Sequence, residues 1–161
     1  MRTFYAAALI ALLSLCAFGQ QPEQQFTPNP HLYDTSANAT AEIANVIAEA
    51  HKDHRRIILV FGGNWCIDCQ VLDYRFHQEP IRPLVDNNFH VVHVDIGEFD
   101  KNLDLVAKYG TTLKKGVPTL SVLDSNGKLL YGMMGGEFES AASMNPQAFI
   151  DFLNKWKPAS R

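Results

Sequence analysis

A short apolar run, followed at once by two glycines and a pair of cysteines, constrains this chain more than any other feature. Residues 57–61 read Ile-Ile-Leu-Val-Phe and are stopped by Gly62-Gly63. A continuous run of this length, rich in β-branched side chains, is typical of a strand that is buried on both faces. The pattern therefore predicts an internal strand of a sheet that helices cover on both sides.

Segments with helical and strand periodicity alternate along the rest of the chain. Near the C-terminal end, Asn126-Gly127 between two apolar runs is a strong hairpin signal. The predicted elements, in chain order, are helix 39–51, strand 57–61, a helix that begins near Cys66 and ends before Pro80, strand 89–96, helix 103–109, strands 118–123 and 128–131, and a final helix after Asn145-Pro146. This order predicts one α/β domain with a mixed central sheet and helices on both faces.

Composition agrees with a single compact domain. The 161 residues are 47% hydrophobic and 19% charged, which is typical of globular proteins. The formal net charge is -3, and so small a negative charge gives no reason to expect nucleic acid as a partner. We expect a monomer that does not bind nucleic acid.

The first residues have the pattern of a secretory signal. Arg2 is followed by an almost wholly apolar stretch over 4–17, and the sequence becomes polar from Gln20 onward. The apolar stretch is too short to span a bilayer comfortably, so we expect a signal peptide over residues 1–19 that is cleaved after Gly19. Lipidation at Cys16 is the alternative, although Leu15 before it is larger than the residue such a signal requires.

The mature chain is expected to have two parts. Residues 20–36 are rich in Gln, Pro, Asn and Thr without periodicity, which predicts a flexible lead-in with at most a short ordered piece at 31–33. The folded domain is expected over residues 37–161. It is long enough to bury a self-sufficient core, so its cysteines are not needed as a structural staple.

Cys66 and Cys69 lie where a helix is predicted to follow the buried strand. Free backbone amides and the dipole at a helix start favour a thiolate, so Cys66 is expected to be the reactive thiol. Cys69, one turn later, is within reach of a mixed disulfide on Cys66. A static disulfide and half of a metal site are the alternatives, but so short a loop gains little from cross-linking and no second ligand pair completes a zinc site. We expect a redox-active disulfide as the only cofactor and no metal.

Two separated motifs resemble those of the thioredoxin superfamily. Residues 65–69, Trp-Cys-Ile-Asp-Cys, match its active-site motif, and residues 116–119, Gly-Val-Pro-Thr, match the segment that carries its cis-proline. The resemblance covers roughly residues 40–157 and implies a thioredoxin-like fold. It also implies that Cys66 attacks substrate disulfides and that Cys69 resolves the mixed disulfide. By the same resemblance, the substrate platform consists of Val117, Pro118 and Trp65.

The chain departs from the family pattern beside the cysteines. Cytosolic thioredoxins carry a buried acid at the strand position that is Val60 here. The usual proton acceptor for the resolving thiol is therefore absent at this position, and Asp68 becomes a candidate for proton transfer. The same acid opposes a second negative charge at Cys66, so we expect a less oxidising disulfide than in relatives with a basic residue there.

Together with the signal, the resemblance implies a thiol–disulfide oxidoreductase that is periplasmic or secreted. We expect it to reduce disulfides of envelope proteins with electrons from a membrane dithiol donor, because a reductant in an oxidising compartment needs such a supply. A disulfide isomerase or oxidant is the alternative within the same chemistry. A non-enzymatic Cu(I) metallochaperone is the alternative outside it.

Overall fold

The computed structural model describes residues 25–159. The expected signal peptide, including Cys16 and Gly19, lies outside these residues. Within the described part of the chain no helix is long and apolar enough to cross a membrane.

A mixed four-stranded sheet forms the centre of the domain. Its strands are β1 (Arg56–Gly62), β2 (Phe89–Asp95), β3 (Thr119–Leu123) and β4 (Leu129–Gly132), in the spatial order β2-β1-β3-β4. β1 runs parallel to β2 and antiparallel to β3, and β3 and β4 form a hairpin. The hairpin turn contains Gly127 at φ 81°, which confirms the turn expected at Asn126-Gly127.

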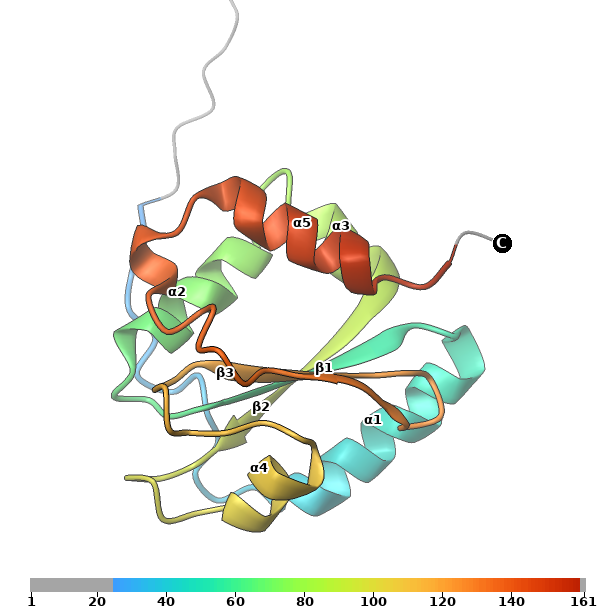
Figure 1. The fold of residues 1–161 in the computed structure, drawn as a ribbon, viewed down its shortest axis with the longest axis horizontal. Coiled ribbons are helices and arrows are strands. Elements are labelled where there is room, and N and C mark those ends of the chain that lie inside the picture. The colour runs from blue at the N-terminus through green and yellow to red at the C-terminus, as the bar shows by residue number, and fades with distance from the viewer. Residues whose placement is uncertain (1–24, 160–161) are drawn as a thin grey trace, which may run out of the picture.

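Helices cover both faces of this sheet. The helices are α1 (Ala39–Asp53), α2 (Ile67–Phe76), α3 (Arg82–Asn88), α4 (Leu103–Lys108) and α5 (Pro146–Trp156). Figure 1 shows α2, α3 and α5 on one face and α1 with α4 on the other. The predicted mixed α/β architecture is confirmed.

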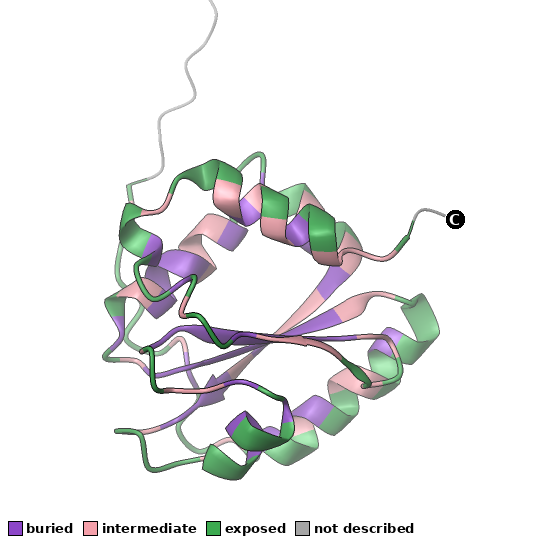
Figure 2. Ribbon diagram, in the orientation of Figure 1, coloured by how far each residue is buried: buried purple, intermediate pink, exposed green. Residues whose placement is uncertain are grey.

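The alternating side chains of β1 divide the core into two layers. Ile57, Leu59 and Phe61 belong to the layer beneath α1 and α4, whereas Ile58 and Val60 belong to the layer beneath α2, α3 and α5. All five side chains are at most 1% exposed. Figure 2 shows this burial along the sheet, with exposed residues on the outer sides of the helices. The strand is therefore buried on both faces, as its apolar run predicts.

Local signals explain where the first and last helices begin. The side chain of Asn38 accepts a hydrogen bond from the Ala41 amide and caps α1. The side chain of Asn145 caps α5 in the same way, through the Gln147 amide, and Pro146 follows at the first helical position. Both are the usual ways of satisfying the free amides of a helix start.

One helix is absent from the sequence prediction. Between Pro80 and β2 the chain forms α3, which packs against β2 and α5. Its seven residues include a single buried side chain, Val85, so they carry no readable periodicity. Pro83 lies in its first turn, where a proline begins a helix rather than breaking it.

Candidate active site

The two cysteines lie at the junction of β1 and α2 and form a disulfide. After β1 ends at Gly62, the Cys66 amide donates to the Gly63 carbonyl oxygen at 3.0 Å, and this turn brings Cys66 to the N-cap position of α2. The Cα atoms of Cys66 and Cys69 are 5.3 Å apart and their sulfurs are bonded. The Cys69 amide donates to Cys66 Sγ at 3.1 Å. The structure thus brings together the two cysteines that the sequence singled out.

The two sulfur-bearing residues differ in accessibility. Cys66 is 6% exposed, whereas Cys69 is 0% exposed. An incoming disulfide or thiolate can therefore meet Cys66 first, because Cys69, in the first turn of α2, is fully buried. This is the arrangement expected of an attacking and a resolving thiol.

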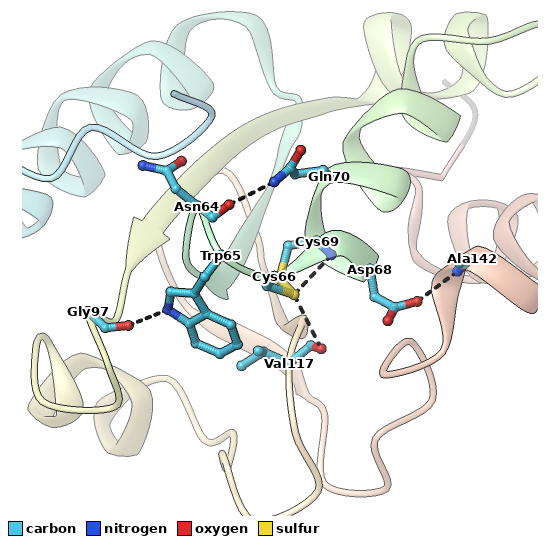
Figure 3. The surroundings of a disulfide bond; sticks show 9 residues. All are labelled: Asn64, Trp65, Cys66, Asp68, Cys69, Gln70, Gly97, Val117 and Ala142. Atoms are coloured by element: carbon cyan, nitrogen blue, oxygen red, sulfur yellow. Dashed lines mark hydrogen bonds between the residues drawn. A yellow bond between two sulfur atoms is a disulfide. The ribbon is translucent and has the colours of Figure 1, made fainter. Parts of the chain in front are cut away.

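The Val117-Pro118 segment lies against the outer cysteine. Cys66 Sγ is 3.6 Å from the Val117 carbonyl oxygen, as Figure 3 shows. The peptide bond between Val117 and Pro118 is cis. Val117 is only 8% exposed and belongs to the same core cluster as Cys66.

Trp65 forms an exposed apolar surface together with residues that the sequence analysis did not select. Its side chain is 46% exposed, and its Nε1 donates to the Gly97 carbonyl oxygen at 2.8 Å. Its ring also contacts the ring of Phe99 with centroids 5.3 Å apart. Phe99 and Ile67 are likewise large apolar side chains that remain exposed. Phe99 was missed because it follows β2 in a loop without periodicity.

Asp68 points away from the disulfide toward the C-terminal part of the chain. Its Oδ1 accepts a hydrogen bond from the Ala142 amide at 2.8 Å, which ties α2 to the short 3-10 turn Ala141–Ser143. The carboxylate also lies in the first turn of α2, where a negative charge stabilises the helix. Its role in proton transfer stays a prediction.

Asn64 and Gln70 were also missed by the sequence analysis. The Gln70 side chain donates through Nε2 to the Asn64 carbonyl oxygen at 2.7 Å, which braces the turn before Cys66. Asn64 in turn holds the backbone of Tyr33 through two hydrogen bonds. Tyr33 lies in the lead-in segment and is 2% exposed. The apolar pair Leu32-Tyr33, within the short ordered piece expected at 31–33, was the available signal for this contact.

In the described part of the chain, metal ligands do not gather around the disulfide. Across residues 25–159, no group of three or more His, Cys, Asp or Glu side chains is placed to hold a metal ion. Among these residues, His93 pairs with Asp73 and His90 pairs with Asp53, so both rings have partners within the fold.

Comparisons with known proteins agree with this site. The sequence matches a family model described as thioredoxin-like over residues 38–125. The structure of this chain is similar to that of a disulphide isomerase from Xylella fastidiosa Temecula1, with a TM-score of 0.72 and 37% sequence identity. The similarity covers 77% of this chain and 95% of that chain. The C-terminal domain of Neisseria meningitidis DsbD, in reduced and oxidised forms, has 23% identity, 73% and 96% coverage, and a TM-score of 0.53. That likeness concerns the fold alone. A comparison with curated proteins gave no match.

The fold, the disulfide at the start of α2 and the backbone of Val117 beside it define a protein that interconverts a dithiol and a disulfide. The chain belongs to the thioredoxin-like family, whose model spans more than half of its length. It is a thioredoxin-like disulfide oxidoreductase.

Proposed function

We propose that this oxidoreductase works in the bacterial periplasm, where it reduces disulfides of envelope proteins. The observation that carries the assignment of roles is the difference between the two sulfurs. Cys66 caps α2 and is partly accessible, whereas Cys69 is fully buried behind it. The proposed location rests on the signal pattern of residues 1–19.

The reaction follows from these positions. The Cys66 thiolate attacks one sulfur of the substrate disulfide, which forms a mixed disulfide and releases one substrate thiolate. The Cys69 thiolate then attacks Cys66 Sγ, which restores the Cys66–Cys69 bond and releases the second substrate thiolate. Two electrons pass from the protein dithiol to the substrate, and the two released thiolates take up the protons.

The surface around Cys66 supports a protein substrate. Trp65, Ile67 and Phe99 present exposed apolar side chains, and aromatic groups of this kind are common at protein-binding surfaces. The carbonyl oxygen of Val117 lies 3.6 Å from Cys66 Sγ. We propose that the backbone at Val117-Pro118 and the ring of Trp65 position the substrate chain on either side of the reacting sulfur.

Asp68 supports the reducing direction. A carboxylate in the same helical turn as the thiols disfavours an additional negative charge there. The dithiol form is then less stable relative to the disulfide, and a couple with a less stable dithiol is a better reductant. Continued turnover requires re-reduction of the disulfide, for which we propose a membrane dithiol donor.

Disulfide isomerisation is the second candidate. The 37% identity over 95% of the Xylella fastidiosa disulphide isomerase favours it. An isomerase uses the same attack by Cys66 but lets a second substrate thiol release the mixed disulfide. Reactivation of a scrambled-disulfide protein without net reduction would favour this candidate over the reductase.

A trapping experiment tests the proposed function. Cys69→Ser keeps the attacking thiol but removes the resolving one, so mixed disulfides should accumulate when the variant is expressed with its own N-terminal sequence in a bacterial envelope. Non-reducing gels should show dithiothreitol-sensitive adducts, and mass spectrometry should identify envelope proteins and the electron donor in them. Cys66→Ser is the matched control and should give few adducts. Absence of adducts from Cys69→Ser, with stoichiometric copper on the wild-type protein, would instead support a metallochaperone.

A further inference from the structure

The hydroxyl group of Tyr33 is buried without a hydrogen-bond partner. Tyr33 is 2% exposed and belongs to the same core layer as Cys66 and Cys69. Among residues 25–159, no donor or acceptor pairs with its hydroxyl oxygen. An unsatisfied buried hydroxyl is costly and uncommon in a folded protein, so its position calls for a partner that this oxidised form does not provide.

The Tyr33 hydroxyl and Cys69 Sγ both border the bare backbone of Gly62. A Cβ atom built on Gly62 would lie 2.5 Å from the Tyr33 hydroxyl oxygen and 2.5 Å from Cys69 Sγ. The two atoms therefore face the same small space, no farther apart than twice that distance. Cys69 Sγ is half of a disulfide here, and a disulfide sulfur is a weak acceptor. Reduction turns it into a thiol or thiolate, and a thiolate accepts strong charge-assisted hydrogen bonds.

Contacts on both sides hold Tyr33 in this position. The Tyr33 amide donates to Asn64 Oδ1 at 2.8 Å, and Asn64 Nδ2 donates to the Tyr33 carbonyl oxygen at 2.9 Å. The Tyr33 ring meets the His93 ring edge to face, with centroids 5.3 Å apart. Tyr33 is thus held in place by Asn64, in the loop that precedes Cys66, and by His93 on β2.

The surroundings keep the hydroxyl protonated. Burial raises the pKa of Tyr33, and the nearby carboxylates of Asp73 and Asp95 raise it further. Asp73 lies on α2 and pairs with His93, while Asp95 ends β2 and pairs with Lys101. A hydroxyl in these surroundings acts as a hydrogen-bond donor and not as a base.

We propose that Tyr33 donates a hydrogen bond to the Cys69 sulfur in the reduced protein and thereby stabilises the Cys69 thiolate and the dithiol state. This inference rests on the proposed exchange at Cys66 and Cys69. When a donor thiolate attacks Cys66 Sγ, the Cys66–Cys69 bond breaks and the electron pair stays on Cys69 Sγ, where the hydroxyl of Tyr33 meets it. When Cys69 attacks in the reverse step, that hydrogen bond is released. Tyr33 keeps its proton in both directions.

This role of Tyr33 compensates for the absence of a buried acid at position 60, where the chain has Val60. The family resemblance predicts a buried acid at that position to serve the resolving cysteine, and Val60 instead packs in the opposite core layer, among apolar residues. Tyr33 supplies a polar group to Cys69 from a different part of the chain, the segment before α1. It differs from an acid in stabilising the thiolate without accepting its proton.

The test is Tyr33→Phe, which removes the hydroxyl and keeps the ring and its packing. Tyr131→Phe is the matched control, because it also removes a hydroxyl, one that donates to Glu137 on the opposite side of the sheet. In equilibrium with glutathione, Tyr33→Phe should shift the protein toward its disulfide by about tenfold, which is about 30 mV in reduction potential. Tyr131→Phe should leave the equilibrium unchanged.

Urea unfolding of both redox forms provides the second measurement. Tyr33→Phe should lower the stability of the reduced protein, while the oxidised protein should be unchanged or more stable, because there the hydroxyl is unsatisfied. An equal effect on both forms, or an unchanged potential, would overturn the role of Tyr33. This comparison uses chemically reduced protein, so it tests Tyr33 even if the wild-type protein fails to exchange with glutathione. Such a failure would count against the proposed function instead.

Discussion

Asp53, the last residue of α1, and His90 on β2 are joined at 2.9 Å between Oδ2 and Nε2. The same carboxylate accepts hydrogen bonds from the Arg55 amide and the Arg55 guanidinium. These contacts connect the end of the first helix to the strand next to β1.

Asp53 should make stability depend on pH at the acidic end. Partial burial raises its pKa, but the hydrogen bonds from Arg55 and His90 outweigh this and lower it to about 2. Because the pKa is lower in the folded state, ionised Asp53 stabilises the fold fully at pH values above the pKa of the unfolded chain, which is near 4. This stabilisation is lost as the pH falls toward 2. Asp53→Asn should cost about 0.2–1 kcal/mol at pH 7, as for an exposed ion pair.

Urea unfolding across pH checks this expectation. The difference between wild type and Asp53→Asn should shrink as the pH falls from about 4 to 2 and should also shrink at high salt. Glu49→Gln, an exposed acid on the same helix, is the control and should show no such dependence. A difference that persists unchanged at low pH would contradict the assignment.

The two thiols of the reduced protein should react at different rates. Cys66 is partly accessible at a helix start, and Cys69 is fully buried. At neutral pH iodoacetamide should modify Cys66 first, since thiolate fraction and access both favour it. Peptide mass spectrometry over a time course measures the two rates. If Cys69 reacts faster, the attacking and resolving roles are reversed.

Gly62 should tolerate no side chain. The methyl group of Gly62→Ala would lie 2.5 Å from both Cys69 Sγ and the Tyr33 hydroxyl oxygen. Overpacking of this kind costs about 1–3 kcal/mol, measurable by urea unfolding of the oxidised protein. Gly63→Ala is the matched control in the same turn. Its methyl group would meet the half-exposed side chain of Trp65, which can move, so the loss should be smaller.

Two substitutions at Asp68 separate its charge from its hydrogen bond. Asp68→Asn keeps an oxygen acceptor for the Ala142 amide, whereas Asp68→Ala does not. Both remove the negative charge near the thiols, so both should let the Cys66 thiolate form at lower pH and should make the disulfide more oxidising. Asp68→Ala should also lower the free energy of unfolding by about 1 kcal/mol relative to Asp68→Asn, because it removes the hydrogen bond to the Ala142 amide. An unchanged potential in both variants would mean that this carboxylate has no influence on the redox pair.

The sequence sufficed for those parts of the molecule whose signals are local. The apolar run of β1, the hairpin glycine Gly127 and the capping Asn145 each act on their immediate neighbours. The same holds for Cys66, because its place between a strand and a helix follows from the residues on either side.

Contacts between distant segments could not be predicted in this way. Tyr33 meets the active-site turn through Asn64, 31 positions later in the chain, and neither residue stands in a periodic pattern. The contact of Phe99 with Trp65 could not be predicted for the same reason, because Phe99 lies in the loop after β2. Asp68 was selected for its closeness to the cysteines in sequence, but the partner that orients it, Ala142, follows 74 positions later in the chain. Such pairings depend on how the layers pack, which a reading of local pattern does not contain.

The sulfur of Cys66 is both the reacting atom and the acceptor that caps α2, through the Cys69 amide at 3.1 Å. Its acceptor strength changes with its chemical state, because a thiolate draws an amide proton more strongly than a disulfide sulfur does. The chemical shift of the Cys69 amide proton should therefore differ between the oxidised and reduced forms. This resonance will move as electrons enter and leave the site, and the chain needs no added probe to reveal which form is present.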